Sequence, residues 1–243
     1  MSGTVRPAFY ALAPGGWRDY VTLLHPPYTA WHLSYVAVGA SLAPHFRAGI
    51  FGLAVLAFFL GMGVAAHALD ELHGRPLQTR IGERTLVALA VLSLSAAAAI
   101  GVAVAVHTSL WLLPFVGAGV FIAVAYNLEL FGGRFHGDPW FALAWGAFPV
   151  LATYVATAET LRIEAVLAAA FAALLSHAQR RLSTPVRLVR RRVTNVSGRI
   201  DLADGTSLAI SRDTLSAEAE RALRAIAAGV VALGLALVLF RVT

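Results

Sequence analysis

Cysteine and lysine are both absent from the 243 residues of this chain. Without cysteine, the chain can form neither a disulfide framework nor a thiolate metal site. Charge is also scarce: 13% of the residues are charged, 58% are hydrophobic, and the mean hydropathy is +0.72. A soluble domain of this size would need more charge to cover its surface. The composition therefore indicates an integral membrane protein.

Residues 1–28 lack the basic segment, sustained apolar run and small-residue cleavage site of a secretory signal peptide. We therefore expect the first membrane helix itself to direct insertion into the cytoplasmic membrane. A helix needs about 20 mostly apolar residues to cross a bilayer. Windows near that length predict an all-α polytopic membrane helix bundle with about seven transmembrane helices, at 28–44, 48–69, 86–106, 110–128, 140–158, 162–178 and 219–240. The first and sixth windows are the weakest, being short or interrupted by Glu164.

Arginine supplies all 19 basic residues, and its distribution predicts the orientation of the chain. Arginines accumulate on the cytoplasmic side of membrane helices. With a cytoplasmic amino terminus and seven crossings, 16 arginines fall inside, leaving outside only Arg47, Arg162 and Arg241. The carboxyl terminus is then outside. We expect any chemistry on the cytoplasmic face, to which this topology assigns 67–84, 126–138 and 179–218.

Polarity divides the chain into three parts. Residues 1–178 form the predicted bundle, 179–218 form a basic cytoplasmic segment, and 219–243 form the final transmembrane helix. Within the basic segment, loosely alternating residues flank an Asp204-Gly205 turn, which predicts a β-hairpin. Asp213 then offers an N-cap for the last helix.

The arginine run at 180–192 predicts a partner for the basic segment. Juxtamembrane arginines attract anionic lipid headgroups, at about 1 kcal/mol per charge. A docking surface for a soluble protein partner is a second interpretation. Nucleic acid is not expected, because no aromatic residues interleave with the arginines.

Two acids, two histidines and two arginines follow the second apolar window in one short stretch. Helical spacing puts His67, Asp70 and Glu71 on one face, and a Gly-Arg-Pro sequence ends the helix. Carboxylates at a cytosolic helix end suit Mg²⁺, which keeps waters and bridges to phosphate oxygens. Arg75 and Arg80 could hold the remaining phosphate charge. Alternatively, the acids mark the membrane boundary and pair with these arginines, a solvated contact worth about 0–1 kcal/mol.

This stretch also resembles a known family motif. The first aspartate-rich motif of UbiA-type intramembrane prenyltransferases is similar to the run D70-E-L-H-G-R-P-L-Q-T-R-I. The family's loop after the fourth helix is similar to A125-Y-N-L-E-L-F-G-G-R-F-H-G-D-P-W, with a Gly-x-x-Pro pattern in the next helix. H25-P-P-Y-T-A-W occupies the place of the family's Arg-Pro entry to helix one. The resemblance covers roughly residues 25–160.

The resemblance implies an all-helical membrane fold whose central cavity opens to the cytoplasm and to lipid. Such enzymes bind a polyprenyl diphosphate through Mg²⁺, ionise it to an allylic cation and let a nucleophile capture the cation. By resemblance, Asp70 and Glu71 are catalytic, and the substrate contacts are Arg75, Arg80, Tyr126, Asn127 and Arg134. Aromatic walls would shield the cation; the candidates are Trp31, Tyr35, Phe58, Phe59, Tyr126, Trp140 and Trp145.

The sequence departs from the family pattern at several positions. Ala66 and Gly74 stand where the motif has Asn and a second Asp. The second aspartate-rich motif is missing, because residues 176–192 contain no acid. The family's nine helices are also reduced to a predicted seven, with a basic hairpin before the last.

Two further interpretations account for these departures. In one, metal ligation is rebuilt as a mixed set that suits Zn²⁺, Mn²⁺ or iron better than Mg²⁺, and the reaction need not be prenyl transfer. The predicted metal ligands are His67, Asp70, Glu71, His73, Glu129, His136 and Asp138. In the other, the fold persists without chemistry, as a membrane subunit that binds lipid or quinone and a protein partner.

Overall fold

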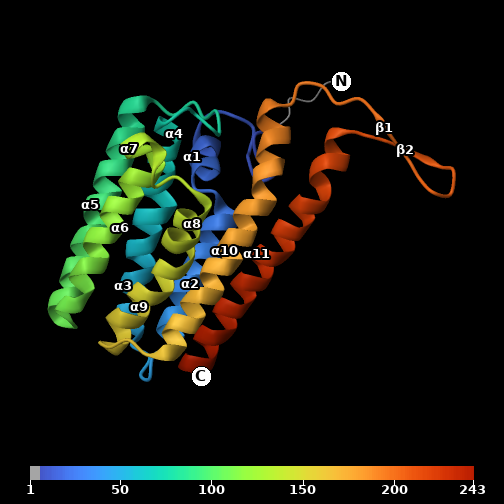
Figure 1. Ribbon diagram of the computed structural model, residues 1–243. Helices are drawn as coiled ribbons and strands as arrows, with labels where there is room; N and C mark the ends of the chain where they lie inside the picture. The colour runs from blue at the N-terminus through green and yellow to red at the C-terminus, as the bar shows by residue number, and fades with distance from the viewer. Residues whose placement is uncertain (1–5) are drawn as a thin grey trace.

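The computed structural model describes residues 6–243, and most of that chain is helical (Figure 1). The first half contains α1 (Trp17–Leu23), α2 (Pro26–Leu42), α3 (Ala48–Phe58), the π-helical segment η1 (Phe59–Ala66), α4 (His67–Leu72) and α5 (Glu83–His107). The second half contains η2 (Leu110–Leu112), α6 (Leu113–Asn127), α7 (Leu130–Gly133), α8 (Asp138–Phe141), the π-helical η3 (Ala142–Ala147), α9 (Phe148–Ala158), α10 (Ile163–Arg192), β1 (Arg199–Asp201), β2 (Ser207–Ala209) and α11 (Arg212–Val242).

Within residues 6–243, five helical rods are long and apolar enough to cross a membrane, which fits an integral membrane protein. They are Ala48–Leu72, Glu83–His107, Leu110–Asn127, Asp138–Ala158 and Arg212–Val242. Their outer faces expose large apolar side chains such as Leu92 and Phe240. Exposed apolar surface of this extent is what a lipid solvent requires.

The predicted count of seven spans is not confirmed. The first and sixth windows are helical and run through the bundle as α2 and α10 (Figure 1). However, α2 has only 17 residues, and α10 carries Glu164 at its start and six arginines between residues 180 and 192. These were also the two weakest windows of the sequence.

Helix α2 is largely buried and packs against α9 and α11. Its Trp31 and Tyr35 lie in a core cluster with Val150 of α9 and Val230 of α11. The indole of Trp31 donates a hydrogen bond of 2.6 Å to the Tyr35 hydroxyl, so the buried polar atoms of this pair are satisfied. Close approach of α2 to α9 depends on Gly39, where a β-carbon would lie 2.4 Å from the Val150 carbonyl oxygen.

The residues of the predicted basic segment include the end of α10 and the start of α11, which corrects the predicted ends of these two helices. Helix α10 does not end near residue 178 but continues to Arg192, with Pro185 inside it. Helix α11 begins at Arg212, and its N-cap is Ser211 rather than Asp213. Ser211 and Thr214 form a capping box, while Asp213 lies in the first turn. A proline costs one backbone hydrogen bond, and packing of the buried Val186 and Val189 offsets that loss.

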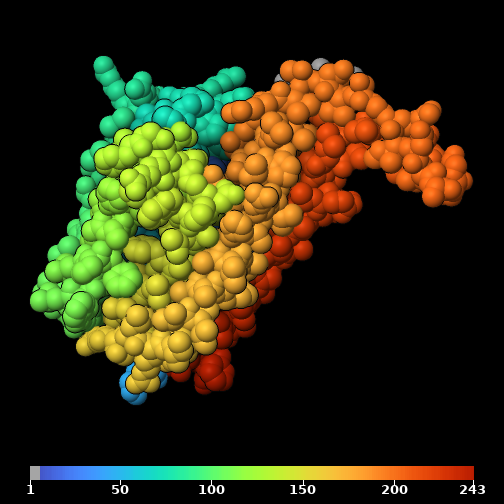
Figure 2. All heavy atoms as spheres, viewed as in Figure 1, coloured from blue at the N-terminus to red at the C-terminus, as the bar shows by residue number. Residues whose placement is uncertain are grey.

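The predicted β-hairpin is confirmed. Strands β1 and β2 pair antiparallel, with Ile200 opposite Leu208. The Asp204 carboxylate accepts hydrogen bonds from the backbone N–H and hydroxyl of Thr206, and Gly205 has φ of 82°. The space-filling view shows the hairpin projecting from the body of the molecule beyond the ends of α10 and α11 (Figure 2).

Candidate ligand cavity at the arginine-rich end

A cavity of about 220 Å³ lies at the end of the bundle nearest the amino terminus. Its walls come from the stretch before α1, the start of α2, the η1–α4 rod, the end of α6, α8 and α10. The surface is hollowed between α10 and the loop after α7 (Figure 2). The ionisable residues among its walls include His25, His32, His67, Asp70, His136, Arg180, Arg187 and Arg191.

The tip of the second predicted span and the glycine-rich bend after the fourth meet at this cavity. His67 and Asp70 from the first, and Tyr126, Asn127 and His136 from the second, all line it. Glu129 lies between the two regions, with one carboxylate oxygen 3.9 Å from His73 Nε2 and 3.9 Å from His136 Nδ1. These segments are separated by more than fifty residues in the sequence.

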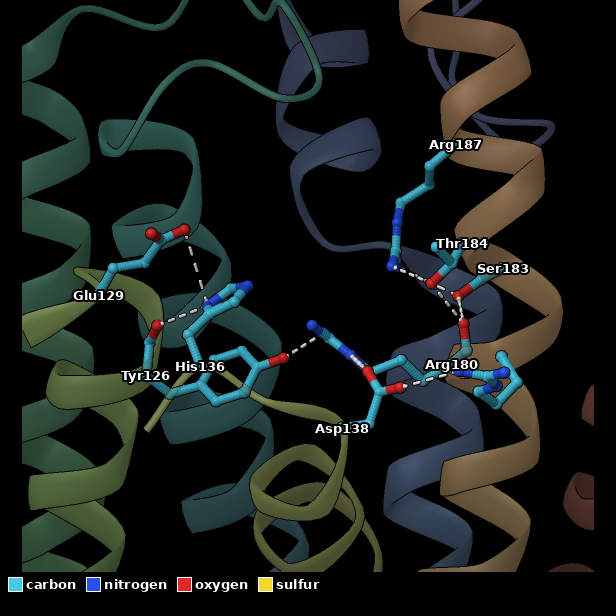
Figure 3. Close-up of polar contacts among 9 residues, drawn as sticks. Tyr126, Glu129, His136, Asp138, Arg180, Ser183, Thr184 and Arg187 are labelled. Carbon is cyan, nitrogen blue, oxygen red and sulfur yellow. Dashed lines mark hydrogen bonds and ion pairs between the residues drawn. The ribbon is translucent and has the colours of Figure 1, made fainter. Parts of the chain in front are cut away.

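Arg180 of α10 joins the bend to the cavity wall (Figure 3). Its Nε lies 2.6 Å from a carboxylate oxygen of Asp138, and its Nη1 donates to the Tyr126 hydroxyl. The guanidinium also lies 5.7 Å from the Tyr126 ring centre and 5.4 Å from that of Phe141. Asp138 is therefore paired with a cation, and its pairing fixes the side chain of Arg180.

Two more arginines of α10 reach the cavity without a carboxylate partner in the described chain. Among residues 6–243, Arg187 hydrogen-bonds only to the hydroxyls of Ser183 and Thr184, each at 3.1 Å (Figure 3). Arg191 donates to the Pro7 carbonyl oxygen at 3.4 Å. Burial, together with the like charges of Arg180 and Arg191, lowers the pKa of Arg187. An anion placed here would relieve that repulsion.

Histidines form the wall opposite α10. The rings of His25 and His67 stack with centres 4.0 Å apart and planes 9° apart. A carbonyl oxygen can only accept, so His67 Nδ1 carries the proton that it shares with the Gly63 carbonyl at 3.0 Å. His25 Nδ1 lies 2.9 Å from the Tyr10 hydroxyl. Burial, and then the neighbouring His67, lower the pKa of His25 well below its usual range, so His25 is neutral at pH 7.

Several predicted site residues lie elsewhere. Glu71 is fully buried and accepts hydrogen bonds from the backbone N–H groups of Leu77 and Thr79 and from the Thr79 hydroxyl. It therefore organises the loop after α4. Three predicted substrate contacts do not line the cavity: Arg75, whose side chain donates to the Ile81 carbonyl, and the exposed Arg80 and Arg134.

The seven predicted metal ligands are not gathered at one point, although His67, Asp70 and His136 line the same cavity. In the chain from residue 6 onward, no three His, Asp or Glu side chains are grouped so that they could hold a metal ion. Glu71 is engaged by backbone donors and Asp138 by Arg180, while Asp70 and His67 remain in the cavity. This arrangement does not fit the expected Mg²⁺ clamp, which needs several oxygen ligands at one point. Metal ligation therefore stays a prediction that no contact in the structure supports.

A second, apolar cavity of about 120 Å³ lies deeper between η1, α5, α6 and the η3–α9 rod. Small residues such as Gly61, Ala97 and Gly119 make room for it, and Phe148 lies across its wall. Trp145 lines both cavities. The polar and the apolar cavity therefore share one lining residue.

The predicted aromatic residues lie in different parts of the bundle. Tyr126 and Trp145 line the polar cavity, with ring centres 4.4 Å apart, and Phe58 lines the apolar one. Trp31 and Tyr35 belong to the core, and Trp140 is 37% exposed. Phe59 packs beside Gly63 on η1.

The arginines of α10 are the functional candidates that the sequence reasoning placed elsewhere, in a lipid-facing tract. Their spacing contains a usable signal, because 180, 187 and 191 differ by seven and by four residues, which is one face of a continuous helix. The predicted end of the sixth span at residue 178 hid that face, because α10 continues to Arg192. His25, His32 and Tyr10 gave no periodic signal of their own.

Comparison of the chain with family models, with curated proteins and with solved structures found no match. The UbiA-type resemblance therefore depends on the quoted motifs alone. Function has to be argued from the two cavities and their side chains.

Proposed function

We propose that this integral membrane protein binds an isoprenoid lipid with a diphosphate or similar anionic head. The head would lie among Arg180, Arg187 and Arg191, and the tail would extend past Trp145 along the apolar cavity. Arg187 carries the proposal, because it is half-buried in the cavity and contacts hydroxyls rather than a carboxylate. A buried charge without a counter-ion costs several kcal/mol in general, and a bound phosphate would remove much of that cost.

The shape of the paired cavities supports an amphipathic ligand. Arginine binds phosphate with several donors at once, and α10 presents three arginines to the polar chamber. The apolar chamber offers almost only carbon atoms. A cavity of about 150 Å³ accommodates one benzene-sized group, so the apolar chamber has room for about one isoprene unit. The remaining tail would lie against the lipid-facing helices.

Binding of geranyl diphosphate to the protein in lipid nanodiscs tests this proposal. Charge-assisted hydrogen bonds contribute about 1.5–3 kcal/mol, so Arg187→Gln and Arg191→Gln should each weaken binding by at least about tenfold. Arg221→Gln is the matched control, because Arg221 is exposed on α11 and pairs with Glu218, far from the cavity lining. Equal affinities for the wild type and all three variants would contradict the proposal.

We propose prenyl transfer as the activity of this site, with Asp70 as its catalytic acid residue and metal contact. Asp70 lines the polar cavity beside His67, whereas Glu71 is engaged in the loop. Asp70→Ala should abolish metal-dependent transfer and leave the protein folded. Unchanged turnover would remove the catalytic role while leaving lipid binding intact. A non-catalytic subunit, the alternative that the projecting hairpin favours, would instead co-purify with a stoichiometric protein partner.

We also propose that α2 and α10 cross the membrane, giving seven spans with the amino terminus in the cytoplasm. Arg47 pairs with Glu159, and Arg241 donates to the Ala43 carbonyl, so the α2–α3 connection, the α9–α10 connection and the carboxyl-terminal end of α11 lie together at one end. The α4–α5 connection and the hairpin lie at the opposite end (Figure 1), and their sequences carry Arg75, Arg80 and Arg199. Because the chain has no cysteine, the single variants Thr206→Cys and His45→Cys can each be labelled with a membrane-impermeant maleimide. In spheroplasts, only the His45→Cys variant should react.

A further inference from the structure

We infer that the histidine wall of the polar cavity, formed by His25, His32 and His67, binds the uncharged hydroxyl group of a second small ligand. The inference deepens the proposed function by adding a neutral ligand beside the anionic lipid. It depends on the location of the cavity and not on the identity of that lipid.

Unsatisfied polar atoms on this wall are the first observation. His25 Nε2, His32 Nδ1 and Gln179 Oε1 are buried and have no hydrogen-bond partner among the described residues. All three residues line the cavity, and His32 and Gln179 are only 4% and 3% exposed. A buried polar group without a partner costs about 1–3 kcal/mol. Three such groups on residues that line one chamber favour a hydrogen-bonding ligand there.

The protonation of the histidines defines the chemistry of that ligand. Because His67 Nδ1 donates to the Gly63 carbonyl, His67 Nε2 keeps a lone pair and needs a donor. The Gln179 oxygen also needs a donor. His25 Nδ1 and the Tyr10 hydroxyl share one proton, so His25 Nε2 is a donor in one tautomer and an acceptor in the other. A hydroxyl group both donates and accepts, and it satisfies either arrangement.

Other polar groups fit this wall less well. A carboxylate or phosphate cannot donate to a lone pair. Such an anion would instead bind the arginines of α10 on the same cavity. An ammonium group cannot accept, and Arg187 and Arg191 would repel it. The chamber is also larger than one water needs, at about 220 Å³ against roughly 10–15 Å³. The ring of Phe141 lies 6.3 Å from that of His32, so a compact hydrocarbon body is accommodated beside the hydroxyl.

Nitrogen-15 spectra of histidine-labelled protein in nanodiscs test this inference, with cyclohexanol as the probe. Methoxycyclohexane is the matched control, because it keeps the ring and the oxygen but has no O–H. We expect cyclohexanol to move the ring-nitrogen signals of His25 and His67 saturably, and the ether to leave them in place. His45, exposed at the opposite end of the bundle, supplies an internal control for partitioning into lipid.

Two outcomes would overturn the inference. If cyclohexanol leaves both signals in place, the wall binds water only. If the ether moves them equally, the hydroxyl is not recognised. As a second measurement, His32→Phe should weaken cyclohexanol binding at least fivefold and leave geranyl diphosphate affinity unchanged. Arg187→Gln should weaken geranyl diphosphate binding and leave cyclohexanol affinity unchanged. Failure of this inference is therefore distinguishable from failure of the proposed function.

Discussion

Glu71 on α4 holds the backbone of Thr79: its Oε1 accepts the Thr79 N–H at 2.8 Å and the Thr79 hydroxyl at 2.9 Å. Its other oxygen accepts the Leu77 N–H at 2.9 Å. The carboxylate is completely buried. One side chain thus fixes the connection between α4 and α5, and with it the tip that presents Asp70 to the cavity.

Glu71→Ala should therefore destabilise the protein by about 3 kcal/mol, because it leaves buried backbone donors unpaired. Thermal unfolding in detergent measures this loss. Glu218→Ala is the control, since the Glu218 side chain is 83% exposed, and it should change stability by less than about 0.5 kcal/mol. If both variants have the same unfolding temperature, Glu71 does not organise the loop, and metal binding again becomes the better explanation for this residue.

The ion pair between Arg190 and Glu220 should couple α10 to α11. Arg190 Nη2 lies 2.7 Å from Glu220 Oε2, its Nε contacts the other oxygen, and the Glu220 side chain is 8% exposed. Glu220→Ala leaves a partly buried guanidinium without its carboxylate, which should cost about 2 kcal/mol. In a double-mutant cycle, Arg190→Met combined with Glu220→Leu should recover most of that loss. Strictly additive single effects would show that the two side chains are not coupled.

The helices were predictable where the sequence contains long, mostly apolar runs. All seven apolar windows are helical, and the Asp-Gly turn of the hairpin is in place. Turn residues and apolar runs are local signals, so each can be interpreted without knowing the tertiary structure around it. His67, Asp70 and His136 line one cavity, and the binding roles predicted for them stay predictions.

The rest depends on contacts that no local pattern records. The sixth predicted span ended at residue 178, where a polar and basic segment begins, yet α10 continues to Arg192, with Val186 and Val189 buried. The site arginines of α10 were consequently assigned to lipid headgroups. Glu71 had the right spacing for a cavity acid, but its partners are backbone N–H groups six and eight residues further on. Tertiary structure decided each of these cases.

The neutral, buried His25 should make stability depend on pH. Burial lowers its folded pKa well below the ordinary value near 6.5. Below about pH 6.5 the unfolded chain therefore binds a proton that the folded chain does not, so stability is complete above that pH and falls as the pH decreases. The charged and titratable groups facing His25 are Tyr10, His32, His67, Arg187 and Arg191.

Unfolding of wild type and His25→Gln between pH 7.5 and 5.5 measures this contribution. One proton changes the slope by at most about 1.4 kcal/mol per pH unit. The wild type should lose stability towards pH 5.5 more steeply than the variant. Parallel pH profiles would show that His25 is already solvated in the folded protein.

Gly39 should be sensitive to substitution, because it lies where α2 crosses α9. A β-carbon at Gly39 would lie 2.4 Å from the Val150 carbonyl oxygen, a backbone atom that cannot rotate away. Gly39→Ala should therefore cost about 2–3 kcal/mol through overpacking. Gly229→Ala on α11 is the matched control, since a β-carbon there would meet no neighbouring element of the described chain within 4 Å.

The Gly229 change removes backbone freedom in the unfolded chain and should leave stability equal or higher by up to about 1 kcal/mol.

Separation of α2 from α9 would also move His32 away from Trp145, because each side chain is carried by one of these two rods. Gly39→Ala should then weaken geranyl diphosphate binding even at temperatures where the variant is folded. A Gly39→Ala protein as stable as Gly229→Ala, with unchanged affinity, would mean that α2 and α9 are further apart than the structure has them.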